Sequence, residues 1–108
     1  MNWTTITDSA QTHDIFSKSY LNPIVIFKHS TRCSLSAMIL RRLEREYTPV
    51  PLEFYLLDLI ANRMISNLVA EKCDVRHESP QLLLIKNGKC IYHESHSGIT
   101  MDDITRYL

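Results

Sequence analysis

Two apolar runs with an amphipathic stretch between them constrain the fold of this chain most strongly. The runs "PIVIFKH" (23–29) and "LEFYLLD" (52–58) are dense in β-branched and aromatic residues, as buried parallel strands are. Between them, residues 34–47 repeat apolar positions with the helical period, and the prolines of "TPVP" (48–51) end that repeat. A strand, a helix and a strand in this order predict an α/β sheet with these two strands parallel.

The remaining segments complete this pattern. We expect a short edge strand at 3–6, helices at 8–21 and 62–73, a hairpin of two strands at 80–94 and a terminal helix at 100–108. The apolar faces of the helices at 8–21 and 62–73 are expected to carry Ile15, Phe16 and Tyr20, and Ile65, Leu68 and Val69, respectively. Asn87 and Gly88 are a typical hairpin turn. The order βαβαβαββα places helices on both faces of a mixed sheet, which is the thioredoxin architecture, in a single domain over residues 1–108.

Charge and hydropathy exclude several classes of protein. Twelve basic and twelve acidic residues give a formal net charge of zero, whereas a nucleic-acid partner would need a basic stripe. No apolar run reaches the roughly 18 to 20 residues that cross a bilayer, and the N-terminal residues do not resemble a secretory signal. Cys33, Cys73 and Cys90 have no zinc-finger spacing, so no metal site is expected. We therefore expect a cytoplasmic monomer with reduced thiols and no membrane contact.

Cys33 is the candidate nucleophile. It lies in "HSTRCSLS", where a predicted strand gives way to a helix, so the free N–H groups of the first helical turn would face its sulfur. Arg32 or His29 could add positive charge, and together these contributions favour the thiolate, which attacks disulfides and also leaves them readily. An inert core role is the alternative for Cys33 and the expected role of Cys73 and Cys90.

Ser36 stands one helical turn after Cys33, where a second thiol would resolve a mixed disulfide from within the protein. Serine cannot attack a disulfide, but its hydroxyl could donate a hydrogen bond to the Cys33 thiolate. The sequence therefore predicts monothiol chemistry, in which a small thiol from solution completes the cycle. Lys28 and Arg32 are either functional charges near this site or merely solvated ones.

Longer segments carry a family resemblance. The stretch "CDVRHESPQLLLIKNGKCIYHESHSGI" (73–99) resembles the part of thioredoxin-like proteins in which a turn after a helix leads to a cis-proline, a strand, a hairpin and a glycine. With "FKHSTRCSLS", "RLERE", "LDLI", "SNLVAE" and "VRHESPQ", nearly the whole chain resembles the YtxJ-type monothiol bacilliredoxins. Members of that family commonly carry proline after the cysteine, where this chain has Ser34.

This resemblance implies an enzyme that removes bacillithiol, a low-molecular-weight thiol, from S-thiolated proteins. Its partners would be those proteins and the small thiol, which acts as a co-substrate, and no cofactor would be bound. Cys33 matches the nucleophile and Ser36 the missing resolving position. Pro80 matches the cis-proline that faces the active cysteine, and Ser79 would offer backbone hydrogen bonds to a bound thiol chain. Phe27 occupies the place of the buried acid of thioredoxins.

The same resemblance places further residues around the thiol. His29, Thr31 and Arg32 would line the rim of the site, and His77 and Glu78 would approach it from the loop before the proline. Arg32 is the expected contact for a carboxylate of the small thiol, because guanidinium and carboxylate groups pair with two parallel hydrogen bonds.

A binding module is the alternative function. Monothiol glutaredoxins, which the single cysteine and following serine also resemble, hold an iron–sulfur cluster with the help of a free small thiol. Their motif is "CGFS", whereas this chain has "CSLS", and the bulkier Ser34 and Leu35 would crowd a cluster.

Overall fold

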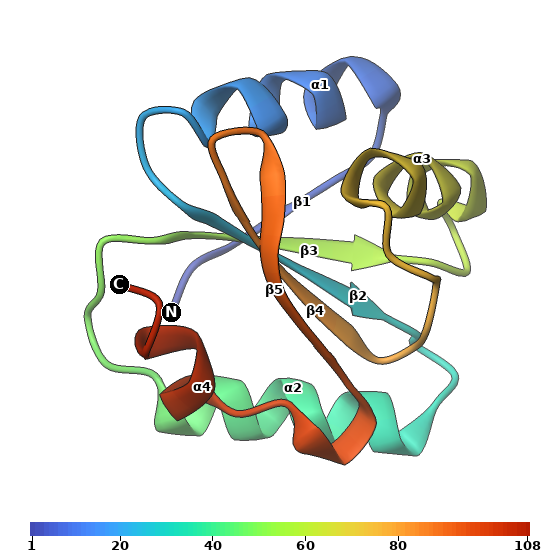
Figure 1. Ribbon diagram of the computed structural model, residues 1–108. Coiled ribbons are helices and arrows are strands. Elements are labelled where there is room, and N and C mark those ends of the chain that lie inside the picture. The colour runs from blue at the N-terminus through green and yellow to red at the C-terminus, as the bar shows by residue number, and fades with distance from the viewer.

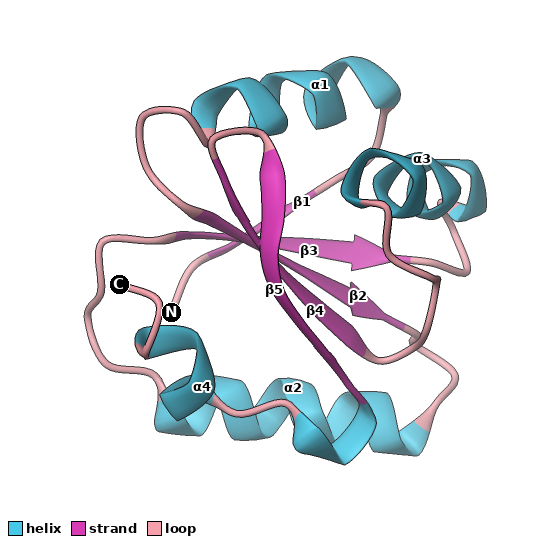
Figure 2. Cartoon of the chain, viewed as in Figure 1, coloured by secondary structure: helices cyan, strands magenta, loops and turns pink.

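A computed structural model describes residues 1–108 as one five-stranded sheet between two layers of helices (Figures 1 and 2). The elements in chain order are β1 (Trp3–Thr5), α1 (Ser9–Lys18), β2 (Ile24–His29), α2 (Ser34–Glu46), β3 (Glu53–Asp58), α3 (Arg63–Cys73), β4 (Gln81–Lys86), β5 (Lys89–Ser95), the 3-10 turn η1 (His96–Gly98) and α4 (Met101–Thr105). None of the helices combines the length and the hydropathy needed to cross a bilayer.

The strands follow the order β1-β3-β2-β4-β5 across the sheet. β2 pairs in parallel with β3 and antiparallel with β4, so that Phe27 lies between Leu56 and Leu82. The predicted α/β class, with early parallel strands and a late antiparallel hairpin, is confirmed. Each crossover from one parallel strand to the next carries a helix over one face of the sheet.

β2 is the centre of the molecule, and all six of its side chains are buried. Successive side chains of a strand point to opposite faces. Ile24 and Ile26 therefore belong to the core under α1 and α3, whereas Val25 and Phe27 belong to the core under α2 and α4. Figure 1 shows these two helix pairs on opposite sides of the sheet. An apolar run without alternation is thus explained by helices on both faces.

The hairpin turn at Asn87 and Gly88 is confirmed, with φ angles of 54° and 75° in the left-handed region. This turn also ends α1, because Asn87 N donates to Ser19 O at 3.0 Å and Gly88 N donates to Ser19 Oγ at 2.8 Å. The helix predicted over 8–21 stops at Lys18 for this reason. Tyr20 lies beyond it with 66% of its surface exposed, so its predicted place on the apolar face is wrong.

The inward face of α3 also differs from prediction. Val69 is buried and Ile65 packs against the same core as expected, whereas Leu68 is only partly buried and packs against neither core cluster. Ser66 and Cys73 are buried instead. The buried Ser66 hydroxyl has a polar partner there, because its Oγ lies 3.1 Å from His77 Nδ1.

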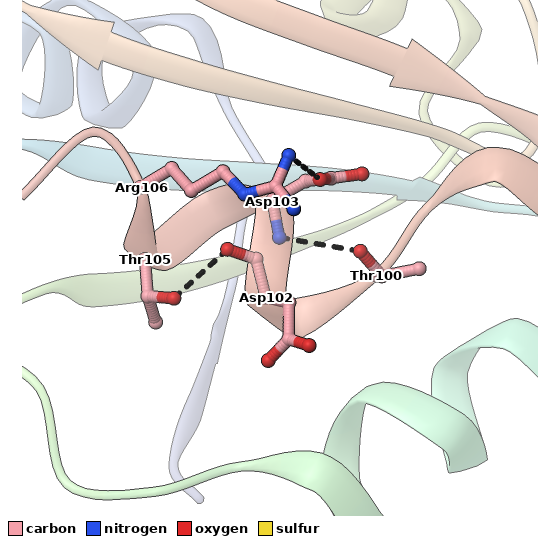
Figure 3. Close-up of polar contacts among 5 residues, drawn as sticks. All are labelled: Thr100, Asp102, Asp103, Thr105 and Arg106. Carbon is pink, nitrogen blue, oxygen red and sulfur yellow. Dashed lines mark hydrogen bonds and ion pairs between the residues drawn. The ribbon is translucent and has the colours of Figure 1, made fainter.

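The terminal helix α4 starts where predicted and ends early (Figure 3). Thr100 Oγ1 accepts a hydrogen bond from Asp103 N at 3.2 Å, which satisfies a free N–H of the first turn. Thr105 Oγ1 donates to Asp102 O at 2.9 Å, and Arg106 pairs with Asp103 at 3.2 Å. The last helical residue is Thr105, so the helix is shorter than the predicted segment 100–108.

Candidate active site at the start of helix α2

Cys33 is the residue that caps the N-terminus of α2. Its backbone is extended, with φ −110° and ψ 119°, and its C=O accepts from Ala37 N at 3.1 Å. The thiol is partly exposed and makes no capping hydrogen bond, so the sulfur remains accessible at the helix start. The first-turn N–H groups behind it lack helical partners, and this positive end of the dipole favours an anion.

A cis peptide bond joins Ser79 to Pro80, as the family resemblance implied. The first residue of β4, Gln81, pairs with Lys28 near the end of β2, so the proline loop and the Cys33 loop occupy the same edge of the sheet (Figure 1). Pro80 O accepts from the N–H of a residue in η1 at 2.9 Å. The buried hydroxyl of Ser79 has no hydrogen-bond partner. This loop therefore places Ser79 and the cis bond at the edge of the sheet that carries the thiol.

Ser36 is fully buried behind Cys33. Its Oγ lies 2.6 Å from His29 Nδ1 and accepts a hydrogen bond from Ser30 N at 3.1 Å. The prediction that this hydroxyl donates to the Cys33 thiolate is wrong, because its hydrogen bonds run to the end of β2 instead. The resolving position thus holds a side chain that is both unreactive and locked in place.

His29 is uncharged at neutral pH. Burial lowers its pKa below the usual 6.5, and the nearby Asp58 carboxylate counters this only in part. The ring also stacks on Phe27, with centroids 6.1 Å apart. The prediction that His29 adds positive charge beside Cys33 is therefore wrong. Its neutral ring acts as a hydrogen-bond partner and packing surface for the floor of the site.

Thr31 and Arg32 are exposed on the loop between His29 and Cys33. Both therefore have surface available at the loop that the resemblance places at the rim, and their contact with a ligand stays a prediction. On the opposite loop Glu78 is exposed as well, and its Oε1 accepts from Ser95 Oγ at 3.1 Å. No cluster of three or more His, Cys, Asp or Glu side chains has an arrangement suited to a metal ion.

Lys28 is fully buried on the face of the sheet covered by α3. Its Nζ donates to Ser66 O at 3.0 Å and lies 3.2 Å from His77 Nδ1, which is also 3.1 Å from Ser66 Oγ. Burial is the main cause that lowers the pKa of Lys28 to about 8. The pKa of His77 is lowered as well, first by burial and then by the positive charge of Lys28. The possibility that Lys28 is a solvated charge is excluded.

The sequence model of one family, described as monothiol bacilliredoxin BrxC, matches residues 4–104. The chain belongs to the monothiol bacilliredoxin family. The protein is accordingly a thiol–disulfide oxidoreductase, and the resemblance inferred from the sequence is confirmed. In this bacilliredoxin the accessible thiol that caps α2 is the candidate for the reactive cysteine.

Solved structures agree on the fold of the bacilliredoxin. One protein with a thioredoxin fold superimposes with a TM-score of 0.84 at 22% identity, covering 95% of this chain and 90% of that one. Thioredoxin from Malassezia sympodialis superimposes with a TM-score of 0.77 at 19% identity, covering 98% of this chain and 87% of that one. Thioredoxin from Trypanosoma brucei brucei superimposes with a TM-score of 0.74 at 20% identity, covering 98% of this chain and 86% of that one. These likenesses confirm the thioredoxin fold.

Lys28 is the residue of this bacilliredoxin that sequence reasoning underrated. It follows Phe27, which points to the opposite face and leaves no carboxylate under Cys33. The Lys28 ammonium instead joins β2 to α3 and to the loop that carries Pro80, through Ser66 and His77. The available signal was a charged residue inside a run whose neighbours are buried on both faces, because such a charge must find hydrogen-bond partners.

Proposed function

We propose that this protein removes bacillithiol, or a similar low-molecular-weight thiol, from S-thiolated proteins through a mixed disulfide on Cys33. One observation carries the proposal: the accessible thiol at the start of α2 has a buried, hydrogen-bonded Ser36 in place of a resolving cysteine. Family membership supports the same reaction class.

The first step transfers the small thiol to the enzyme. The Cys33 thiolate attacks the small-thiol sulfur of the protein mixed disulfide, forms a new disulfide to that sulfur and expels the substrate's cysteine as a thiolate. That thiolate takes up a proton from water, so one disulfide is exchanged for another without net oxidation. Cys33 attacks from the N-terminus of α2, where the positive end of the helix dipole favours negative charge on reacting groups.

The second step needs a thiol from solution. A second small-thiol molecule attacks the bound small-thiol sulfur, forms the small-molecule disulfide and releases Cys33 as a thiolate. Ser36 cannot take this part, because a hydroxyl is not a nucleophile towards disulfides and its oxygen is bonded to His29 and Ser30. Cys33 therefore carries the small thiol from the first step to the second, and it is the only thiol of the site that reacts.

Substrate contacts follow from the two loops at this edge of the sheet. The backbone of Ser79, next to Pro80, would bind the extended chain of the small thiol. Exposed Arg32 would pair with a carboxylate of that thiol, and exposed Thr31 lies beside it. The partners are S-thiolated proteins and the small thiol in the cytoplasm, and the chain works as a monomer without a bound cofactor.

A transfer assay with intact-mass detection tests the proposal. A bacillithiolated protein is incubated with the wild type, with Cys33→Ser and with the matched control Cys90→Ala, and the release of bacillithiol is followed over time. We expect release and a bacillithiol adduct with the wild type and with Cys90→Ala, and neither with Cys33→Ser. Equal release by the wild type and Cys33→Ser would show that Cys33 does not do the chemistry.

The identity of the small thiol is tested with the same protein carrying bacillithiol, glutathione or cysteine. If Arg32 recognises a carboxylate, Arg32→Ala should raise KM for the preferred substrate several-fold and leave kcat little changed, because the lost contact exists before and during the reaction. An unchanged KM for all three substrates would remove Arg32 from the binding site.

A further inference from the structure

Cys73 and Cys90 meet on the face of the sheet covered by α1 and α3. Cys73 is the last residue of α3 and is 8% exposed, and Cys90 in β5 is partly buried against the same core cluster. Cys73 and Cys90 therefore pack on one apolar cluster, where α3 is in contact with β5, and both are free thiols. The two thiols are close enough for each to shift the pKa of the other. Two cysteines that are far apart in the sequence thus form a close pair.

A β-bulge in the hairpin creates this contact. The register of β4 and β5 passes from Leu84 opposite Tyr92 to Ile85 opposite Cys90, so that Ile91 is an extra residue in β5. An extra residue interrupts the alternation of side chains along a strand. Cys90 therefore points to the core under α1 and α3, whereas Tyr92 packs against the core on the other face.

We propose that Cys73 and Cys90 form a reversible intramolecular disulfide, which is a second redox site of this protein. A disulfide requires the two sulfurs to approach to about 2.05 Å, with Cβ atoms roughly 3.5–4.5 Å apart. Two thiols that pack on the same cluster, at the contact between α3 and β5, can reach this geometry by side-chain rotation. Cys73 ends a helix and Cys90 lies next to a turn, so both backbones can adjust at element ends.

This pair is separate from the Cys33 site. Cys90 is opposite Ile85, which in turn is opposite Ile24, the first residue of β2. Cys33 follows the other end of β2, and a strand of six residues spans about 20 Å. Neither thiol of the pair can reach a mixed disulfide on Cys33. The pair therefore needs its own oxidant, for which a low-molecular-weight disulfide is suited.

Cys90 is the thiol that reacts first, because it is the more exposed of the two. A hydrogen bond from Cys73 lowers the pKa of Cys90, and the same bond together with burial raises the pKa of Cys73. The Cys90 thiolate attacks the small disulfide, forms a mixed disulfide and expels one thiolate, which takes the proton lost by Cys90. Cys73 then attacks the Cys90 sulfur and gives its proton to the second expelled thiolate. Two electrons pass from the pair to one small disulfide, which leaves as two thiols.

The new bond would close a loop around residues 74–89, which contain His77 and the cis bond at Pro80. It would also fasten the end of α3 to β5. Closing a loop of this length restricts the unfolded chain, so the oxidised protein should melt about 10 °C higher than the reduced one.

The test uses Cys33→Ser, so that only Cys73 and Cys90 remain. The reduced protein is incubated with oxidised glutathione, and the protein thiols that remain free are alkylated. The intact mass and the disulfide-linked peptides are then determined. We expect a species that has lost two hydrogens, carries no alkyl group and yields a Cys73–Cys90 peptide pair. Alkylation of both thiols, or stable glutathione adducts without a linked peptide pair, would overturn the proposal.

The thermal midpoint gives a second readout on the same samples. Oxidation should raise it in Cys33→Ser and leave it unchanged in Cys33→Ser/Cys90→Ala. Should the double variant fail to fold, the linked peptide pair in Cys33→Ser decides alone. The outcome is independent of the proposed function, because Cys33 is absent throughout.

Discussion

His29 Nδ1 lies 2.6 Å from Ser36 Oγ, and this bond ties the end of β2 to the first turn of α2. Cys33 lies on the loop and helix start that the bond encloses. Ser36 also accepts from Ser30 N on the same loop. A residue that replaces a reactive thiol therefore has a structural task of its own, which is to hold the backbone around Cys33.

Ser36→Ala should lower the free energy of unfolding by about 1–3 kcal/mol, because His29 Nδ1 and the Ser30 N–H lose a buried partner. Urea unfolding at neutral pH measures this. The control Ser34→Ala, at an exposed position of the same helix, should change stability by no more than about 0.5 kcal/mol. Equal effects of the two substitutions would mean that the buried hydroxyl bonds contribute nothing.

Ser36→Cys should convert the site from monothiol to dithiol chemistry. The new thiol would lie one helical turn from Cys33 and could attack a mixed disulfide there. After reaction with a small disulfide, intact mass should show a lasting adduct on the wild type and an adduct-free internal disulfide in the variant. Alkylation and peptide mapping identify the linked pair. A persistent adduct in Ser36→Cys would show that the buried slot keeps the second sulfur away from Cys33.

Acid should destabilise the protein through His29. Because burial lowers its folded pKa below 6.5, the unfolded chain binds a proton first as the pH falls through 6.5, and stability decreases until the folded pKa is reached. Between pH 7 and pH 5 the wild type should lose more unfolding free energy than His29→Asn. The control His13→Asn, at an exposed position of α1, should follow the wild type. Parallel curves for all three proteins would contradict the buried neutral imidazole.

Lys28 should make the free energy of unfolding depend on pH in the alkaline range. The folded pKa of Lys28 is about 8, against the ordinary lysine value of 10.5, so the unfolded state holds one more proton than the folded state between these pH values. The Lys28 contribution to stability therefore rises with pH, by about 1.4 kcal/mol per unit. The difference in unfolding free energy between the wild type and Lys28→Met should grow in favour of the wild type from pH 8 to pH 10. Denaturant unfolding under reducing conditions measures it.

Lys86→Met supplies the matched control, because Lys86 is exposed at the end of β4. The difference in unfolding free energy between Lys86→Met and the wild type should stay constant over the same pH range. A flat curve for Lys28→Met would mean that the Lys28 ammonium is charged and solvated after all.

The periods of apolar residues were sufficient to predict the order of strands and helices. These patterns are local properties of the chain. A period of two or an unbroken apolar run indicates a strand, a period of 3.6 indicates a helix, and residues such as Asn87 and Gly88 indicate a turn. Each correctly located element depends on one of them. Cys33 could be placed at a helix start for the same reason. The cis bond at Pro80 and the rim positions of Thr31 and Arg32 came instead from the family resemblance.

The errors share a different origin. Tyr20 lies outside the helix because the hairpin turn takes the hydrogen-bonding groups of Ser19. Ser36 bonds to His29 and not to Cys33 because α2 packs against the end of β2. In both cases the competing partner comes from another element, and local patterns contain no information about it.

The sequence by itself determined the thioredoxin-like fold and the single thiol at its edge, because periodicity and turn chemistry act between near neighbours in the chain. Only the tertiary structure decided that Lys28 is buried beneath the cis-proline loop and that Cys73 meets Cys90. The first depends on α3 covering that face of β2, and the second on a one-residue bulge that turns Cys90 towards α3. Such contacts arise when elements pack, and a shift of one residue in a strand is enough to send a side chain to the other face.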